Sequence, residues 1–300
     1  MSAALDAAPG RELPVLAVVG VGLIGGSFAA ALRRAGKVGK VIGAGRSRDA
    51  LVRAKGLGLI DEAVALEDAA RQADIIVLAT PVGAIPAILS RLLPFLKPDA
   101  LLTDVGSTKA DVVKAARSAL GDRSECFVPG HPIAGAEKTG PEAASADLFV
   151  GRTVVLTPLE ENTEQCRTLA IDLWKACGAR VVLMEPDAHD AALASVSHVP
   201  HFLASVFMAQ VSGADDADLR LSLAGSGFRD FTRISAGSAE MWQDIFMANR
   251  DAVLQELKAF RALLEQTESA LAQGDARELH ELLERAAVAR RFWGSRSGHE

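Results

Sequence analysis

Two short polar segments in the first half of the chain carry side chains suited to proton transfer. Asp104–Lys109 (DVGSTK) follows an apolar run, and His131 stands in a glycine-bracketed loop, Gly130–Gly135. Ligands gather beyond the carboxyl ends of the strands in an open α/β sheet, so we expect Ser107 and His131 at one edge of a sheet. A single histidine is more often structural, but imidazole is the side chain best matched to proton transfer near neutral pH. We predict that His131 accepts the hydroxyl proton when a hydride leaves an alcohol carbon.

The second half of the chain contributes a pair of histidines and a pair of arginines. His198 and His201 have no third ligand at metal-site spacing, so we predict no metal site. Arg229 and Arg233 lie four residues apart and would share one face of a helix. Two guanidinium groups suit a substrate with two carboxylates, although ion pairs with nearby acidic side chains are the alternative. Trp242 is expected in the core.

A glycine-rich turn near the start of the chain predicts a dinucleotide site. Gly20, Gly22 and Gly25 have GxGxxG spacing between the apolar run Leu13–Val19 and a small-residue helix at Ser27–Ala35. The first glycine permits a tight turn, the second lets the backbone approach a pyrophosphate, and the third lets helix and strand pack closely. The helix N-terminus offers free N–H groups and a partial positive charge to phosphates. The expected cofactor contacts in and after the strands are Gly20, Gly22, Leu23, Ile24, Gly25, Thr80, Pro81 and Asp104.

The residues after the second strand indicate which dinucleotide is preferred. An NAD enzyme usually ends this strand with an acidic residue that binds the ribose 2′-hydroxyl. Here VIGA continues into Gly45, Arg46, Ser47 and Arg48, with no carboxylate before Asp49. Arginine and serine can bind a 2′-phosphate by charge-assisted hydrogen bonds. We therefore predict NADP as the preferred cofactor and leave NAD use open; the alternative is that both arginines are ordinary surface charges.

The elements that must position these residues fall into two regions. Strand-length apolar runs alternate with helical patterns up to residue 186, which predicts βαβ units and a parallel sheet. From residue 187 the pattern is helical without a strand signal, and a helix apolar nearly all round must be buried in a core or against another subunit. We expect a tail at 1–12, an α/β Rossmann-type dinucleotide-binding domain at 13–186 and an all-α helical substrate and dimerisation domain at 187–295, pairing as a homodimer.

Composition excludes several other classes of protein. The chain has 300 residues, 49% of them hydrophobic, and a net charge of −6 with scattered basic residues, so nucleic acid is not an expected partner. Apolar runs such as Ile75–Ala79 are strand-length, no signal-peptide layout begins the chain, and we expect no membrane association. Cys126, Cys166 and Cys177 match neither a disulfide framework nor a zinc site. We expect a reducing, cytoplasmic location.

Six motifs in order resemble the prephenate dehydrogenase and arogenate dehydrogenase family of cyclohexadienyl dehydrogenases. They are GVGLIGGS, DVGSTK, GHPIAGAEKTG, HDAALASVSHVPH, GFRDFTRIS and MWQDIF. The resemblance implies an oxidative decarboxylation in tyrosine biosynthesis, in which a hydride leaves the carbinol carbon of a cyclohexadiene and loss of carbon dioxide makes the ring aromatic. Prephenate would give 4-hydroxyphenylpyruvate and arogenate would give tyrosine; the sequence leaves the choice between them open.

The resemblance also implies roles for individual residues. His131 would bind the substrate hydroxyl, with Ser107 orienting it, as the catalytic pair. The implied substrate-binding residues are Arg233, Arg229, His201, Ser197 and Glu137. Many relatives have threonine or serine at the position of Ala136, so one substrate hydrogen bond available to them is missing here.

Two alternative functions remain for a chain of this plan. A 3-hydroxyacid dehydrogenase or imine reductase would usually place a catalytic lysine in the first helix of the helical region, where this chain has Ser197, His198 and His201. A non-catalytic NADPH-sensing protein would bind the dinucleotide without turnover.

Overall fold

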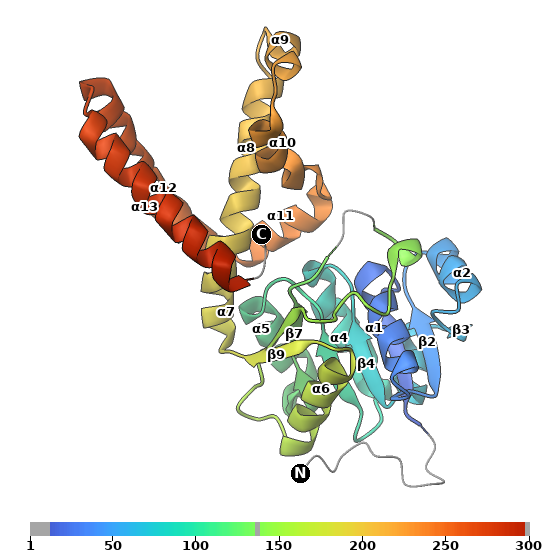
Figure 1. The fold of residues 1–300 in the computed structure, drawn as a ribbon. Helices are drawn as coiled ribbons and strands as arrows, with labels where there is room; N and C mark the ends of the chain where they lie inside the picture. Colours follow the sequence, from blue (N-terminus) through green and yellow to red (C-terminus); the bar gives the residue numbers. More distant parts are fainter. Residues whose placement is uncertain (1–12, 136–138, 298–300) are drawn as a thin grey trace. The chain divides into compact units, whose positions relative to one another are not determined.

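The structure, a computed structural model, describes residues 13–135 and 139–297 (Figure 1). The predicted tail at 1–12 and the predicted substrate residue Glu137 lie outside the described residues. Backbone contacts group the chain into two compact units, Met1–Arg250 and Asp251–Glu300.

Within the described part of the first unit, six parallel strands form a sheet in the order β3-β2-β1-β4-β5-β6. Strands β1 (VLAVV) and β4 (IIVL) are continuously apolar because a parallel sheet is covered on both faces. The strands are β1 Val15–Val19, β2 Lys40–Ala44, β3 Glu62–Ala63, β4 Ile75–Leu78, β5 Leu101–Asp104 and β6 Phe127–Val128.

Helices cover both faces of this sheet and create two cores. Leu16 of β1 belongs to one core with Phe28 and Trp174, whose rings lie 4.5 Å apart, and Val19 belongs to the other with Leu89. The helices are α1 Leu23–Arg34, α2 Arg48–Gly56, α3 Leu66–Gln72, α4 Ile85–Leu92, α5 Ala110–Leu120 and α6 Glu164–Ala176. The order of strands and helices matches the predicted βαβ series.

A second, smaller sheet places His131 in a strand. Strands β7 (Gly130–Pro132), β8 (Thr153–Leu156) and β9 (Arg180–Leu183) lie side by side, with β7 antiparallel to β8 and β8 parallel to β9. His131 is opposite Val155 in this pairing. The prediction of a loop at Gly130–Gly135 is therefore wrong for its first three residues, because backbone pairing to β8 holds His131.

The rest of the first unit is helical. Its elements are α7 Pro186–Leu193, a π-helical turn Ala194–His198, α8 Val199–Ser212, α9 Ala217–Ser222, α10 Ser226–Thr232, a 3₁₀ turn Arg233–Ala236 and α11 Ala239–Ala248. Proline at the first position of α7 has no N–H to lose and is preset for a helix. The predicted class, an α/β region followed by an all-helical one, is confirmed.

The continuous helix from Pro186 to Ser212 is the one described helix that is long and apolar enough to cross a membrane by length and composition alone. Core helices of soluble proteins pass the same test, and a third of its most apolar stretch is buried. It also carries the buried polar side chains of His189, Asp190, His198 and His201. Ionisable groups are costly within a bilayer, which disfavours a membrane-spanning position for this helix.

The second unit consists of two long helices, α12 (Arg250–Gln273) and α13 (Ala276–Ser297). Gly274 adopts a left-handed conformation at the turn between them, with φ +69°. Asp275 then caps α13, because its carboxylate accepts hydrogen bonds from the N–H groups of Arg277 and Glu278.

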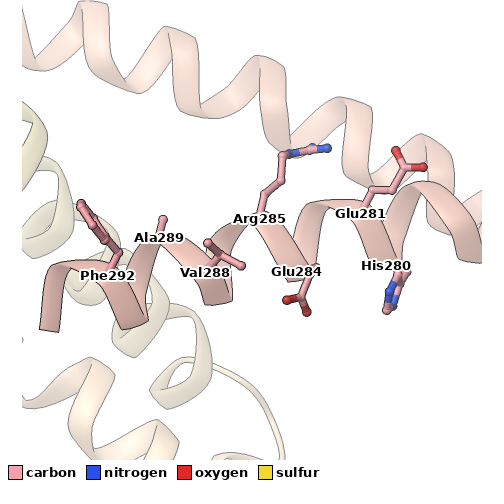
Figure 2. Close-up of a pocket in the computed structure, with 7 residues that line it drawn as sticks. All are labelled: His280, Glu281, Glu284, Arg285, Val288, Ala289 and Phe292. Atoms are coloured by element: carbon pink, nitrogen blue, oxygen red, sulfur yellow. The ribbon is translucent and has the colours of Figure 1, made fainter. Parts of the chain in front are cut away.

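A shallow hollow of about 550 Å³ lies along one face of α13 (Figure 2). It is lined by His280, Glu281, Glu284, Arg285, Val288, Ala289 and Phe292. None of these is a predicted site residue. It is one side of a helix rather than an enclosed site.

Candidate active site

The glycine turn between β1 and α1 has the shape of a phosphate cradle. A Cβ atom on Gly20, which has φ +94°, would lie 2.3 Å from the carbonyl oxygen of Ala79. A Cβ atom on Gly25 would lie 2.5 Å from the carbonyl oxygen of Gly20, whereas one on Gly22 would meet nothing within 4 Å. Two of the glycines are thus required by chain packing, and Gly22 borders open space through which a ligand can approach the backbone.

The N-terminus of α1 is free of side-chain partners at this turn. Gly22 provides no side-chain cap, and no acidic residue lies in the first turn, which contains Leu23 and Ile24. The adjoining end of β4 carries Thr80, whose buried hydroxyl has no hydrogen-bond partner within the described chain, followed by half-buried Pro81. Free N–H groups, a helix dipole and an unpaired hydroxyl fit a dinucleotide here.

The residues predicted to choose the cofactor follow β2. Arg46 is 86% exposed, and its Nη2 lies 3.9 Å from Oε1 of Glu240. The Ser47 hydroxyl caps α2 by accepting a hydrogen bond of 3.1 Å from the Ala50 N–H. Arg48 begins α2 and is exposed. No acidic side chain ends β2, but Ser47 already has a structural role.

Asp104, predicted as a cofactor contact, is buried and bonded to neighbouring residues of the chain. It is fully buried with Lys109, and its Oδ2 lies 2.5 Å from the Lys109 Nζ. Oδ2 also accepts from the N–H of Gly106 at 2.7 Å, and Oδ1 accepts from the N–H of Gly130 at 3.1 Å. Burial raises the pKa of Asp104 against the opposing effect of Lys109. The carboxylate ties the segment that carries half-buried Ser107 to strand β7, and its oxygens are occupied by partners within the chain.

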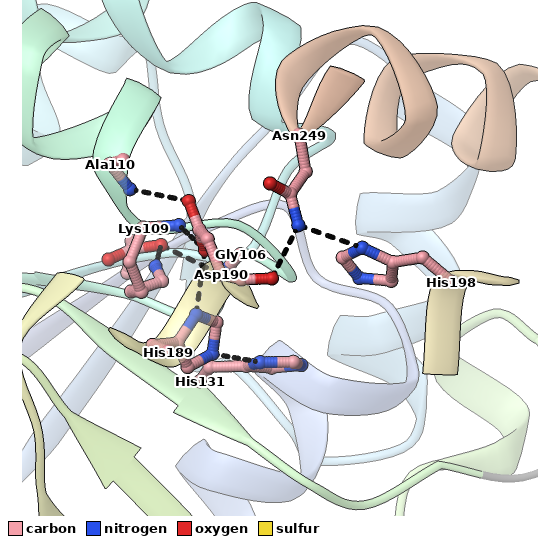
Figure 3. Close-up of polar contacts among 9 residues, drawn as sticks. Gly106, Lys109, Ala110, His131, His189, Asp190, His198 and Asn249 are labelled. Atoms are coloured by element: carbon pink, nitrogen blue, oxygen red, sulfur yellow. Dashed lines mark hydrogen bonds and ion pairs between the residues drawn. The ribbon is translucent and has the colours of Figure 1, made fainter. Parts of the chain in front are cut away.

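His131 heads a chain of hydrogen bonds that joins β7 to α7 and α5 (Figure 3). Its Nδ1 lies 2.8 Å from Nε2 of His189, and Nδ1 of His189 lies 2.7 Å from Oδ1 of Asp190. Asp190 also accepts hydrogen bonds from the backbone N–H groups of Lys109, at 2.8 Å, and Ala110, at 2.9 Å. The carboxylate therefore caps the start of α5 while it holds His189.

The electrostatics of this chain keep His131 uncharged. Burial lowers the pKa of His131 well below its usual range, and the neighbouring His189, Lys109 and His198 lower it further. Burial opposes ionisation of Asp190, but hydrogen bonds from His189 and from two backbone N–H groups outweigh it and lower its pKa. An uncharged imidazole has a lone pair on one nitrogen, so His131 can act as a base.

Sequence reasoning assigned no role to His189 or Asp190. They are 58 and 59 residues from His131 along the chain, so no spacing rule links them. The available signal was an adjacent His-Asp pair at the start of an apolar helix, where an acidic side chain must find hydrogen-bond partners if it is buried.

Asn249 connects this chain to the next histidine. Its Nδ2 donates to the carbonyl oxygen of Asp190 at 2.7 Å and lies 3.1 Å from Nδ1 of His198 (Figure 3). His198 is 1% exposed, and burial lowers its pKa to about 4. Its Nε2 is buried without a partner among the described residues. Ser197, the neighbouring predicted residue, is half-buried in the π-helical turn.

His201 is stacked on Trp242. The ring centroids are 3.6 Å apart and the planes are inclined by 14°. A Cβ atom on Gly237 would lie 2.7 Å from Trp242 Nε1 and 3.2 Å from His201 Cε1, so this backbone approaches the pair closely. His201 is buried, which lowers its pKa, and Trp242 is half-buried rather than in the core as predicted.

The two predicted substrate arginines lie on a separate surface segment. Arg229 is in the last turn of α10 and Arg233 begins the following 3₁₀ turn, so a single α-helical face does not carry both. Both side chains are exposed, and the 3₁₀ turn packs against α8, the helix that carries His201. The hydrogen bonds of Asp104, Lys109 and Asp190 unite the Ser107 segment with the strand that carries His131.

Among the described residues, no group of three or more potential ligands is placed to hold a metal ion.

Two family models match the chain in succession. The model described as "Prephenate dehydrogenase, nucleotide-binding domain" matches residues 28–183, and "Prephenate dehydrogenase, dimerization domain" matches residues 185–285. The chain belongs to the prephenate dehydrogenase family. This membership confirms the resemblance read from the six motifs and the prediction of an NAD(P)-dependent oxidoreductase.

Relatives of the prephenate dehydrogenase family match nearly the whole chain. A cyclohexadienyl dehydrogenase of Zymomonas mobilis is 36% identical over 280 residues, covering 92% of this chain and 94% of the relative. The crystal structure of prephenate dehydrogenase from A. aeolicus with hydroxyphenyl propionate and NAD⁺ has a TM-score of 0.87 at 34% identity, covering 94% of this chain and 99% of that one. Synechocystis arogenate dehydrogenase has a TM-score of 0.78 at 33% identity, covering 93% and 99%.

Proposed function

We propose that this chain catalyses the oxidative decarboxylation of prephenate, arogenate or both with a nicotinamide dinucleotide, as a step of tyrosine biosynthesis. The observation that carries the proposal is the His131 imidazole, half-buried, uncharged and held by a hydrogen-bond chain, in a member of the prephenate dehydrogenase family. When bound, the nicotinamide supplies the hydride acceptor.

The chain's own residues would then position the substrate and manage one proton. His131 accepts a hydrogen bond from the substrate hydroxyl and takes its proton as the hydride leaves. Ser107 orients the same hydroxyl, and Arg233 fixes a carboxylate so that the carbinol C–H points correctly. Aromatisation drives the loss of carbon dioxide, so the protein supplies mainly position. We further propose Arg229, Ser197, His201 and Glu137 as substrate-facing residues.

The dinucleotide would lie on Gly20, Gly22, Leu23, Ile24 and Gly25, with Thr80 and Pro81 beside it. We propose a preference for NADP, supported by the missing carboxylate after β2 and by two exposed arginines, Arg46 and Arg48. NAD use stays open, because the A. aeolicus relative was crystallised with NAD⁺.

We also propose that residues 13–186 form the dinucleotide domain and that residues 187–295 form the substrate domain and a homodimer contact in the cytoplasm. A family model described as a dimerization domain covers most of the second range. Exposed apolar side chains on its helices support a protein partner there; they include Val206, Leu264, Leu271, Leu283 and Phe292.

One assay tests the proposed function. Purified protein is incubated with prephenate or arogenate and with NAD⁺ or NADP⁺, and the absorbance of the reduced nicotinamide is followed together with carbon dioxide release. Turnover of at least one pair with equal amounts of both products supports the function. Reduced cofactor without carbon dioxide would point to a simple alcohol dehydrogenase, and binding without turnover would point to a sensing protein.

A further inference from the structure

The contacts around His189 determine which of its nitrogens carries hydrogen. The Asp190 carboxylate accepts from two backbone N–H groups, which keeps it ionised at the start of α5. An ionised carboxylate can only accept hydrogen bonds. Nδ1 of His189, 2.7 Å from Oδ1 of Asp190, must therefore be the donor.

The same argument determines which nitrogen of His131 carries hydrogen. His189 is fully buried, and a neutral imidazole ring with hydrogen on Nδ1 has a lone pair on Nε2. Nδ1 of His131 lies 2.8 Å from that lone pair and must donate to it. A neutral His131 with hydrogen on Nδ1 has its own lone pair on Nε2, the nitrogen that no described side chain engages in this chain of bonds.

We propose that His189 and Asp190 are positioning residues that hold His131 in the tautomer with hydrogen on Nδ1, so that its Nε2 is the proton acceptor toward the substrate hydroxyl. The proposal rests on the proposed function for the identity of the substrate, but the tautomer itself is a property of the protein. The groups that face His131 are His189 and Asp190 of α7, Lys109 before α5, and His198 of the π-helical turn.

The proton balance of the reaction shows why this arrangement is useful. The substrate hydroxyl gives its proton to His131 Nε2 while the carbinol carbon loses its hydride. The bond to the ring carboxylate breaks, carbon dioxide leaves, and the bonding electron pair enters the ring, which becomes an aromatic phenolate. The phenolate oxygen then takes the proton back from Nε2. His131 thus accepts one proton and later donates it to the product, and no net proton is released.

The hydrogen-bond chain can share the charge in the interval. While His131 holds the extra proton, its Nδ1 proton can pass along the hydrogen bond to Nε2 of His189, which lies 2.8 Å from Nδ1. The positive charge then lies on the ring that contacts the Asp190 carboxylate. A buried cation beside a carboxylate is favoured over one without an opposite charge.

Substitutions of His189 separate these effects. In His189→Gln, the amide can accept from His131 through oxygen and donate to Asp190 through nitrogen, so it keeps the tautomer but cannot take a proton. In His189→Leu, both hydrogen bonds are lost. We expect kcat to fall by about 10²–10⁴-fold in His189→Leu, the span for a misplaced acid–base group, and by a clearly smaller factor in His189→Gln, with KM little changed in both.

The matched control is Asp187→Asn. Asp187 is an exposed carboxylate in the first turn of the same helix, so this variant changes α7 without touching the chain of bonds. Asp187→Asn should keep wild-type kcat. Equal losses in His189→Leu and His189→Gln, or unchanged turnover in His189→Leu, would overturn the proposal.

A direct readout is the ¹⁵N spectrum of the histidine rings in the whole enzyme at neutral pH, with the His131 signals assigned by their loss in His131→Gln. We expect His131 to show a protonated Nδ1 and an unprotonated Nε2, unchanged in His189→Gln and in Asp187→Asn. A protonated Nε2 in the resting enzyme would overturn the proposal. Because this measurement needs no substrate, the tautomer can be verified even if neither prephenate nor arogenate is turned over.

Discussion

At the scale of single residues, His131 combines a lowered pKa with a hydrogen-bond partner on one ring nitrogen. Its ring is sheltered enough for burial to hold the pKa low, and one nitrogen is already committed to a partner. The sequence identified this histidine from its glycine-bracketed setting but not its partners, since His189 and Asp190 reach it only through the packing of α7 against α5. Contacts between residues that are distant in the sequence cannot be predicted from a single sequence.

Replacing His131 by asparagine should lower kcat by about 10²–10⁴-fold, because an amide cannot accept the hydroxyl proton at neutral pH. Steady-state kinetics measures the loss. Dinucleotide affinity, measured by fluorescence titration, should stay near wild type because the glycine turn is untouched. Wild-type turnover in this variant would remove His131 from the proposed mechanism.

Arg46 is the residue to change in a test of cofactor choice. In Arg46→Asp, the loss of a charge-assisted hydrogen bond of about 1.5–3 kcal/mol should shift the ratio of kcat/KM values toward NAD by roughly 10–100-fold. Lys55→Asp, an exposed change in the last turn of α2, reverses the same charge away from the end of β2 and should leave the ratio unchanged. An unchanged ratio in Arg46→Asp would mean that another group reads the 2′-phosphate or that none is bound.

At the scale of elements, sequence reasoning succeeded where the signal is local and continuous. The apolar runs of β1 and β4 and the glycine turn after β1 could be predicted because a strand buried on both faces requires such residues. Strand β7 of the second sheet could not, because it has only three residues and is defined by pairing with β8 more than twenty positions away. The hydrogen bond from the Gly130 N–H to Asp104 could not be predicted for the same reason, because Gly130 belongs to that strand.

Replacing glycine by alanine should have different effects at two positions of the glycine turn. Gly22→Ala adds a methyl group in open space, so stability should be unchanged while dinucleotide affinity falls by about tenfold or more, since the backbone can no longer be approached closely. Gly25→Ala forces a contact of 2.5 Å with the Gly20 carbonyl oxygen and should lower the free energy of unfolding by about 1–3 kcal/mol. Urea unfolding and a dinucleotide titration of both variants distinguish the two effects, and a stability loss in Gly22→Ala would contradict this description of the turn.

At the scale of the whole molecule, the buried histidines make stability depend on pH. The pKa of His198 is lowered to about 4, and the pKa values of His131 and His201 are also lowered. Between about pH 4 and 6.5 these histidines bind protons in the unfolded chain but not in the folded chain. Their contribution to the free energy of unfolding is therefore present at neutral pH and is lost as the pH falls through this window.

Urea unfolding at pH 7 and at pH 5 measures this effect. His198 alone can contribute up to roughly 3 kcal/mol over the full window, so the unfolding midpoint should fall measurably by pH 5. His198→Gln, whose amide oxygen can accept from Asn249, should show a smaller fall. An equal fall in wild type and variant would mean that His198 is protonated in the folded enzyme.

The proposed homodimer makes a prediction about mass. Light scattering of the purified protein should give twice the chain mass of 31.4 kDa. Leu264→Glu combined with Leu283→Glu places charges on exposed apolar positions of α12 and α13 and should yield monomers. Val52→Glu, at an equally exposed position of α2, is the matched control and should remain dimeric. A wild-type mass of one chain at micromolar concentration would exclude a stable dimer.

The π-helical turn at Ala194–His198 sets the direction of every side chain that follows it in α8. One extra residue per turn shifts the helical phase by about 100° relative to an uninterrupted α-helix. His201 follows this turn by three residues and stacks on the Trp242 ring with that offset in place. Length is therefore constrained here more strictly than residue type: a one-residue deletion in this turn would rotate His201 away from its ring partner, whereas exchanging the exposed side chain of Val196 would leave the geometry intact.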